Sequence, residues 1–129
     1  MAAELCFDGA SRGNPGPASI GVVLDIAGET IERSDTIGEA TNNEAEYAAL
    51  QAGLEAARAH DVDRIRIVGD SELVVKQLTG EYRVNASNLE PLVEEVRALL
   101  EQFDEWSIEH VGRNQNERAD GLANRAFDT

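Results

Sequence analysis

The strand-like segment at residues 64–69, which lies between two helix-like segments, constrains the fold most tightly. Residues 3–8, 18–26 and 30–37 alternate apolar and polar side chains, as strands do, and residues 45–60 hold strong helix formers without proline. Residues 64–69 then alternate again. Because a strand that follows a helix returns parallel to an earlier strand by a right-handed crossover, the sequence predicts an antiparallel meander followed by a parallel strand.

Several short signals predict where helices begin and end. Residues 41–44 (Thr-Asn-Asn-Glu) and 87–90 (Ser-Asn-Leu-Glu) both fit a capping box, and residues 71–79 read as a short helix closed by Gly80. Residues 114–117 are expected to open a last helix.

The remaining segments complete an α/β pattern. Residues 89–103 carry apolar side chains at helical spacing, and residues 105–111 alternate as a last strand. The apolar stripe of the last helix consists of Ala119, Leu122, Ala123 and Ala126. The order is three strands, helix, strand, two helices, strand, helix. We therefore expect a five-stranded mixed sheet, three antiparallel strands and then parallel ones, flanked by helices.

Length and composition indicate one ordinary domain. A chain of 129 residues with 42% apolar residues can bury one core, so we expect a single domain over residues 1–129. No apolar run approaches the length of a membrane span, and the first residues lack the basic and apolar regions of a signal peptide. A monomer in the cytoplasm, with no membrane partner, is the expectation. The lone Cys6 is interpreted as a core residue.

The net charge of −14 argues against a polyanionic ligand at first sight. The charge is uneven, however, because residues 110–129 balance three arginines against three acids, so that end of the chain can approach nucleic acid. Lys76 is the sole lysine. An acid-rich surface almost without lysine is typical of proteins from a high-salt cytoplasm, which screens self-repulsion, and we hypothesise a halophilic source.

Two aspartates follow strand-like segments that should be neighbours in the sheet. Asp8 ends residues 3–8 and Asp70 follows residues 64–69. Carboxylates at the ends of adjacent parallel strands repel each other unless a cation or a proton lies between them. A divalent metal is one interpretation. The alternatives are that Asp8 belongs to a turn with Gly9 and that Asp70 caps the following helix.

Two further acids lie on helices. Glu46 shares a helix face with a stripe that should pack on the sheet, and a carboxylate buried there needs a partner or a metal. An exposed helical glutamate is the alternative. Asp120 borders the stripe of the last helix, where it could instead pair with Arg125. Oxygen-only ligands favour Mg²⁺ or Mn²⁺ over zinc. The stripe that Glu46 shares consists of Ala49, Leu50, Gly53 and Ala57.

Four motifs resemble those of type 1 ribonuclease H along almost the whole chain. Residues 7–17 (FDGASRGNPGP) resemble the opening block of that family, and residues 41–46 (TNNEAE) its second block. Residues 69–71 (GDS) and 116–123 (NERADGLA) resemble the third and fourth blocks. The resemblance identifies the four acids as catalytic metal ligands: Asp8, Glu46, Asp70 and Asp120.

The resemblance implies an endonuclease that hydrolyses the RNA strand of RNA/DNA hybrids and leaves 5′-phosphate and 3′-hydroxyl ends. Two Mg²⁺ ions are expected per site, with Mn²⁺ as a possible substitute. Asp8 would be shared by both ions, Glu46 would hold one and face the RNA, and Asp120 would hold the ion beside the attacking water.

The resemblance also nominates residues that meet the substrate. These are Asn14, Asn42, Asn43 and Glu72, although Asn14 and Asn42 could equally be a turn residue and a helix cap. His110, ten residues before Asp120, is either a catalytic loop histidine or a packed core residue. One departure stands out. Only residues 80–86 join the two helices where some members carry a basic protrusion, so phosphate affinity should be weaker.

Two other functions remain open at this point. A nuclease of the same fold could cut another substrate, such as double-stranded RNA, because carboxylates alone do not choose a substrate. A non-catalytic hybrid-binding module would be expected to lose an acid and to carry a basic patch, and the sequence shows neither feature.

Overall fold

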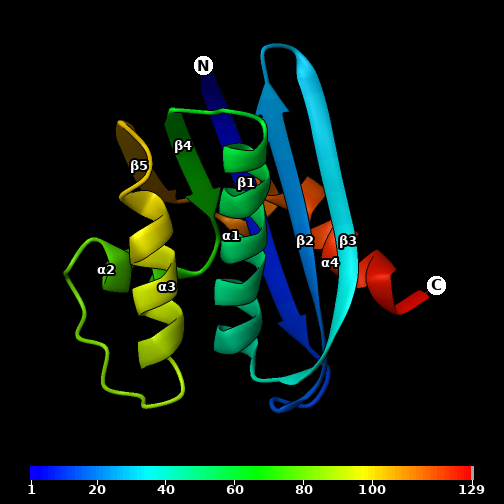
Figure 1. The fold of residues 1–129 in the computed structure, drawn as a ribbon. Coiled ribbons are helices and arrows are strands. Elements are labelled where there is room, and N and C mark those ends of the chain that lie inside the picture. Colours follow the sequence, from blue (N-terminus) through cyan, green and yellow to red (C-terminus); the bar gives the residue numbers. More distant parts are fainter. Residues whose placement is uncertain (129) are drawn as a thin grey trace.

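The computed structural model describes residues 1–128, which form one five-stranded mixed sheet. The strand order is β3-β2-β1-β4-β5, with β1 antiparallel to β2, β2 antiparallel to β3, and β4 parallel to both β1 and β5 (Figure 1). The predicted sheet is confirmed. Its strands are β1 (Ala2–Ser11), β2 (Gly16–Ile26), β3 (Glu29–Ala40), β4 (Arg64–Gly69) and β5 (Glu105–His110).

Four α-helices flank the sheet on both faces. α1 (Asn42–Ala59) and α3 (Glu90–Leu100) pack side by side on one face, and α4 (Glu117–Arg125) lies on the other (Figure 1). α2 (Glu72–Leu78) follows β4. Two single-turn helices, η1 (Arg113–Gln115) and η2 (Ala126–Asp128), flank α4. The predicted order of strands and helices is correct.

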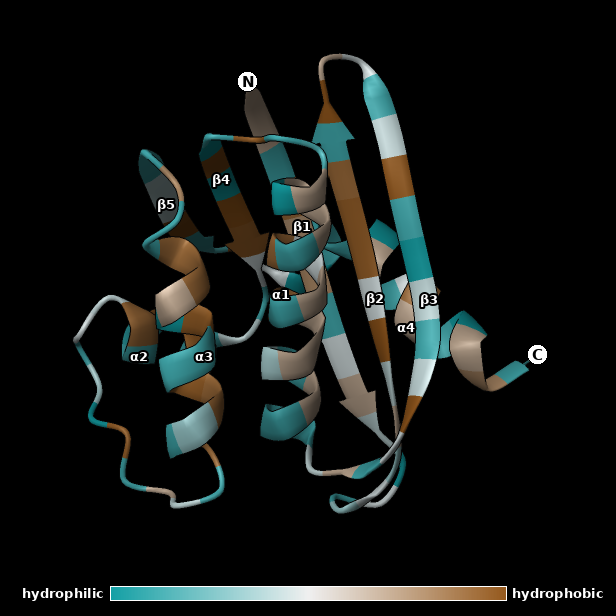
Figure 2. Cartoon of the chain, viewed as in Figure 1, coloured by the Kyte–Doolittle hydropathy of each residue, from teal (hydrophilic) through white to brown (hydrophobic). Residues whose placement is uncertain are grey.

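The main core lies between the sheet and the pair α1 and α3. β2 is buried along almost its whole length because α4 covers its second face, whereas β3 is a polar edge strand (Figure 2). The core consists mostly of aliphatic side chains, together with the aromatic rings of Phe7, Tyr47 and Phe103. Cys6 is only half-buried and packs against the small cluster of Val23, Ala119 and Leu122, so its interpretation as a core residue is correct only in part.

α4 approaches the sheet closely and is held by few apolar contacts. A Cβ on Gly21 would overlap the backbone of Ala119, so only glycine permits this approach. The Ser19 and Ser34 hydroxyls donate to the carbonyl oxygens of Ala123 and Leu122, near the end of the helix. Because a helix leaves its last carbonyl groups without partners, these two hydroxyls stabilise that end.

One of the two predicted capping boxes is present. Thr41 caps α1, its Oγ1 accepting from the Glu44 N–H while the Glu44 carboxylate accepts from the Thr41 N–H. The box predicted at residues 87–90 is wrong. The chain enters α3 through a turn in which the N–H groups of Leu89 and Glu90 donate to the carbonyl of Ala86, so Ser87 does not cap the helix.

Over residues 1–128, no helix is both long and apolar enough to cross a membrane.

The acidic surface predicts that the stability of the fold depends on salt. Raising KCl from about 0.1 M to about 2 M shortens the Debye length from about 10 Å to below 3 Å, which screens the repulsion among exposed carboxylates. The free energy of unfolding should therefore rise with KCl, as measured by urea denaturation at each salt concentration. Glu94 and Glu95 are exposed on α3, and the E94Q/E95Q variant should show a smaller salt effect. Equal midpoints at both concentrations would contradict the halophile hypothesis.

Candidate metal centre and active site

Asp8 and Asp70 meet where the parallel pairing of β1 and β4 ends. That pairing stops at Phe7 opposite Gly69, one residue before each aspartate. Asp8 does not end its strand as predicted, because β1 continues to pair with β2 as far as Ser11. Nor does Asp70 cap α2, since the Ser71 hydroxyl accepts from the Val74 N–H in that role. The alternative interpretations of both aspartates, as turn residue and as helix cap, are therefore wrong.

Glu46 points from α1 into the same space. Its residue is only 6% exposed, so the alternative of an exposed helical glutamate is wrong. The backbone of Gly9 makes this position possible, because a Cβ there would overlap the backbone of Ala45 and Glu46. The Gly9 N–H donates to Glu46 Oε1, which fixes the carboxylate beside β1.

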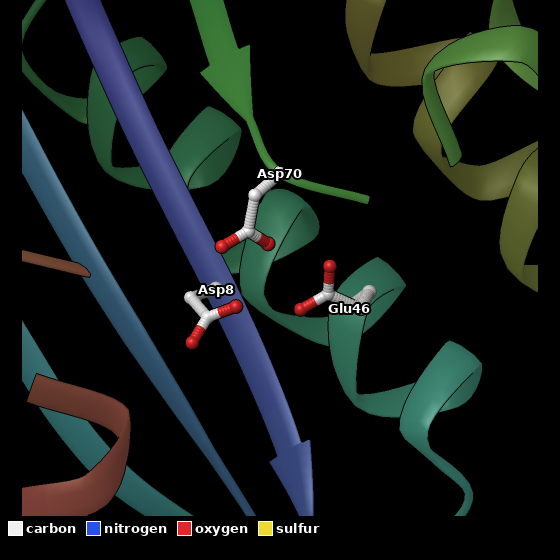
Figure 3. A group of neighbouring side chains, drawn as sticks. All are labelled: Asp8, Glu46 and Asp70. Carbon is white, nitrogen blue, oxygen red and sulfur yellow. The ribbon is translucent and has the colours of Figure 1, made fainter. Parts of the chain in front are cut away.

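The three carboxylates converge on one point. Ligand oxygens of Asp8, Glu46 and Asp70 all lie within 4.8 Å of one another, and the side chains point toward each other from β1, from α1 and from the end of β4 (Figure 3). Burial first, and then the neighbouring charges, raise the pKa of Asp8 far above its ordinary value; burial also raises the pKa of Glu46, to about 7. The two carboxyl groups lie close enough to act on each other's pKa, the Asp8 value being raised by Glu46.

Asp120 completes the group from α4. It lines the same pocket as the other three acids and lies close enough to Asp8 to help raise the pKa of that residue. Within residues 1–128 it forms no ion pair with Arg125, the alternative partner. The four predicted acids therefore share one pocket, although only three of them form the tight cluster.

Asn116 ties α4 to the strand that carries Asp8. It is 2% exposed, and its Nδ2 donates to the carbonyl oxygen of Phe7 at 2.9 Å. The Asp120 N–H in turn donates to the carbonyl of Asn116. Asn116 therefore connects the residue before Asp8 with the first turn that holds Asp120. In the sequence Asn116 stands out only as part of a motif, so this role was not predicted.

The pocket around the acids is a polar cavity of about 450 Å³. Asn42 and Asn43 line it, as predicted for substrate contacts, and so do Arg113 and Asn124, which the sequence analysis did not single out. Their closeness to Asp120 in the sequence was the signal that could have identified these two residues.

The other predicted substrate residues lie near the pocket without lining it. The Asn14 side-chain oxygen accepts from the Asn42 N–H and the Asn42 side chain accepts from the Ser11 N–H, so both asparagines also have structural roles. His110, at the end of β5, is exposed, which excludes the core alternative. Asn42 follows the cap residue Thr41 and is not itself the cap.

The donor set fits a hard divalent cation. Every ligand is a carboxylate oxygen, which suits Mg²⁺ or Mn²⁺. Asp70 Oδ2 is buried and has no hydrogen-bond partner within residues 1–128, which leaves this oxygen open to a bound cation. All three acids of the tight cluster can reach one ion, and Asp120 stands beside Asp8.

Known proteins share both this sequence and this fold. A family model described as Reverse transcriptase-like matches residues 6–126. A ribonuclease HI of Halobacterium salinarum is 56% identical over 125 residues, which are 95% of this chain and 62% of that protein. The crystal structure of RNase H1 from the same halophilic archaeon superposes with a TM-score of 0.94 at 54% identity, covering 99% of this chain and 98% of that one.

A second solved structure carries a ligand. LC11-RNase H1 in complex with an RNA/DNA hybrid superposes with a TM-score of 0.91 at 38% identity, covering 98% of this chain and 96% of that one. The chain belongs to the type 1 ribonuclease H family. It spans about 62% of the length of the halobacterial ribonuclease H, and only 34% of a mycobacterial relative described as the bifunctional protein Rv2228c.

The raised carboxyl pKa values predict that the metal-free ribonuclease H loses stability as the pH rises. The folded Asp8 and Glu46 bind protons more tightly than their unfolded counterparts, so the folded state gains most below about pH 4 and loses that gain as the pH rises through the folded pKa of each group, about 7 for Glu46 and about 10 for Asp8. The free energy of unfolding in chelator should fall by a few kcal/mol, roughly, between pH 5 and 8. Asp8→Asn should remove most of this slope, and Mg²⁺ should reverse it. A slope of the opposite sign in chelator would contradict the prediction.

Removing the Asn116 side chain should weaken both the fold and the metal site. Asn116→Ala leaves the buried Phe7 carbonyl without its donor, at a cost of about 1–3 kcal/mol in the free energy of unfolding. Because Asp8 follows Phe7, the Kd for Mn²⁺ measured by calorimetry should also rise several-fold. Asn114→Ala, at an exposed position two residues earlier, is the matched control and should change neither quantity. A wild-type Kd in Asn116→Ala would show that Asn116 does not position the ligands.

Proposed function

We propose that this ribonuclease H is an endonuclease that hydrolyses the RNA strand of RNA/DNA hybrids. The observation that carries the proposal is the convergence of Asp8, Glu46 and Asp70 within 4.8 Å, in a polar pocket, in a chain of this family. The RNA/DNA hybrid held by LC11-RNase H1, which is 38% identical, supports the choice of substrate. The products would carry 5′-phosphate and 3′-hydroxyl ends.

The four acids would hold two divalent cations. By the family resemblance, Asp8 binds both ions, Glu46 and Asp70 complete the tight cluster, and Asp120 serves the ion beside the attacking water. When bound, such ions activate a water and stabilise the leaving oxygen. We propose Mg²⁺ as the natural ion and Mn²⁺ as a substitute, in a monomer that acts in the cytoplasm through a single domain over residues 1–129.

The protein's own contribution is to hold the carboxylates ready and to orient the RNA. The Gly9 N–H keeps Glu46 in place before any ion arrives. Asn42 and Asn43 stand at one side of the pocket, where their amides can meet 2′-hydroxyl groups, which only the RNA strand carries. Asn14 supports that side by accepting from the Asn42 N–H, while Glu72 and His110 lie at the β5 side.

Two alternatives have different requirements. A nuclease for double-stranded RNA needs 2′-hydroxyl contacts on both strands, and a non-catalytic hybrid-binding module needs affinity without a complete metal site. All four acids share one pocket, which favours catalysis over binding alone.

One assay separates these functions. The protein is incubated with labelled hybrid, RNA duplex and DNA duplex, with Mg²⁺, Mn²⁺ or chelator, at low and at molar KCl. Only the RNA strand of the hybrid should be cut, and chelator should abolish cleavage. Asp70→Asn should lower the rate by at least roughly 10²-fold, because it removes a ligand charge.

The matched control is Asp35→Asn, which makes the same change at an exposed position on β3 and should leave the rate unchanged. Full activity of Asp70→Asn would refute the metal assignment. Cleavage of the RNA duplex at the rate of the hybrid would identify the other substrate class.

A further inference from the structure

β1 runs on past the acid cluster (Figure 3) and leads to Arg12, the residue after its end. Asp8 and Ala10 line the pocket of the acids from β1, and Asp120 and Asn124 line it from α4. Residues two apart on a strand share a face, and so do residues three or four apart on a helix. The wall that β1 and α4 form should therefore continue from Ala10 to Arg12, and from Asn124 to the turn η2.

Arg12 and Phe127 meet where this wall continues. The guanidinium carbon of Arg12 lies 4.1 Å from the centroid of the Phe127 ring, which belongs to η2. The face of an aromatic ring attracts a cation without neutralising it, so the positive charge stays available to another group. The contact thus places a cation just beyond the pocket, between the end of β1 and the end of α4.

Arg12 keeps its charge without an acidic partner. Within residues 1–128 it forms no ion pair, whereas Arg33 pairs with Asp35 and Arg66 bridges two glutamates. Its side chain is exposed, in a chain that holds 25 acids. An exposed arginine that packs on a ring, away from these acids, is prepared for an anion that comes from outside the chain.

The backbone of Arg12 is held at a fixed place relative to the predicted substrate residues. Its N–H donates to the carbonyl oxygen of Pro17 at 2.8 Å, and a Cβ on Gly16 would lie 2.6 Å from its own carbonyl oxygen, so the turn is tight. The N–H of Ser11, the preceding residue, donates to Asn42 Oδ1 at 2.9 Å. Arg12 and Asn42 are therefore fixed on opposite sides of the end of β1.

The position of Arg12 suits a phosphate other than the one that is cut. Along the chain, Asp8 and Arg12 are about 13 Å apart, at about 3.3 Å per extended residue. The acids must hold the phosphate of the reaction, so a nucleic-acid strand that continues along the wall presents another of its phosphates to Arg12. A guanidinium can donate two parallel N–H groups to two oxygens of that phosphate.

We propose that Arg12, held by Phe127, binds a phosphate of the RNA strand beside the cut site. The inference rests on the proposed function and deepens it, because it names a subsite for the strand that is cut. The RNA strand is the one that reaches the acids, and Arg12 continues the wall on the α4 side, opposite Asn42 and Asn43. The subsite gives phosphate affinity to a chain that has only residues 80–86 in place of a basic protrusion.

The first test measures binding of a labelled RNA/DNA hybrid by fluorescence anisotropy, with Mg²⁺, in the cleavage-deficient Asp70→Asn background. Arg12→Gln should raise the Kd about tenfold, as the loss of a charge-assisted hydrogen bond does, and Arg12→Lys should recover part of that loss. The slope of log Kd against log KCl should become shallower by about 1. Arg64→Gln is the matched control, at an exposed arginine at the start of β4, and should stay within about twofold with an unchanged slope.

Neutral linkages identify the strand and the phosphate. Each phosphate near the cut site is replaced in turn by a methylphosphonate, with a 2′-O-methyl group on the adjoining ribose and a 2′-O-methyl phosphodiester as the matched control. At one position of the RNA strand, the replacement should weaken binding about tenfold with Arg12 present and leave the Arg12→Gln protein unaffected. The same pattern on the DNA strand, or equal losses for both proteins at every position, overturns the proposal.

The ring beneath the guanidinium has its own test. Phe127→Leu keeps an apolar side chain and removes the aromatic face, so it should weaken hybrid binding about two- to threefold. In the Arg12→Gln background it should add nothing, because the side chain that the ring orients is already gone. Equal losses in both backgrounds overturn the part assigned to Phe127.

Kinetics and stability separate a substrate contact from a structural role. With Asp70 intact, Arg12→Gln should raise KM and leave kcat within about twofold, because a contact away from the reacting bond is made equally before and during the reaction. A lower unfolding midpoint or a weaker Kd for Mn²⁺ that accounts for the loss overturns the proposal.

The failure of this subsite and that of the proposed function are distinguishable. If the wild type cuts the hybrid and Arg12→Gln behaves like Arg64→Gln, Arg12 is not a substrate contact. If the wild type does not cut the hybrid at all, the proposed function itself fails.

Discussion

Repulsion among buried carboxylates is the constraint on which the rest of the molecule depends. Asp8, Glu46 and Asp70 would separate if their backbones were free to move, because like charges in a poorly hydrated space destabilise one another. They stay together because β1 and β4 are hydrogen-bonded up to the residue before each aspartate, and because α1 is pressed against β1 at Gly9. The pairing of β1 with β4 and the packing of α1 on β1 therefore offset the repulsion within the acid cluster.

α4 is attached in a different way from α1. Its apolar contacts are few, and polar bonds from Ser19, Ser34 and Asn116 hold it on the far face of the sheet. This attachment places Asp120 by hydrogen bonds of defined direction, whereas apolar packing alone would tolerate small shifts. A helix that carries only one acid of the four is therefore positioned through its backbone and through the buried amide of Asn116.

The fold and the acid cluster could be predicted from the sequence because they follow from periodic patterns and local motifs. The alternation of residues 64–69 and the capping box at Thr41 are local signals, and the structure confirms both. Errors arose where a local pattern had competing partners. The residues at 87–90 match the capping-box pattern, but the Ala86 carbonyl accepts from the Leu89 and Glu90 N–H groups, and α3 begins without a side-chain cap.

Features that depend on distant partners were beyond a single sequence. β1 extends past Asp8 because its pairing with β2 continues after its pairing with β4 has ended. The sequence of β1 does not show where the neighbouring strand ends. The positions of Asn116 and Arg113 likewise depend on how η1 meets β1. Sequence spacing placed Asp120 in a helix, and only the tertiary contact shows which side chains stand around it.

The bond from Asn116 to Phe7 joins residues 109 positions apart, and this separation has a consequence for synthesis. A chain that grows from its N-terminus can pair β1 with β2 and β3 early, because those contacts are local in sequence. The fourth acid arrives only when α4 has left the ribosome. While translation continues, a nascent chain therefore displays an incomplete ligand set and cannot yet assemble the full metal centre.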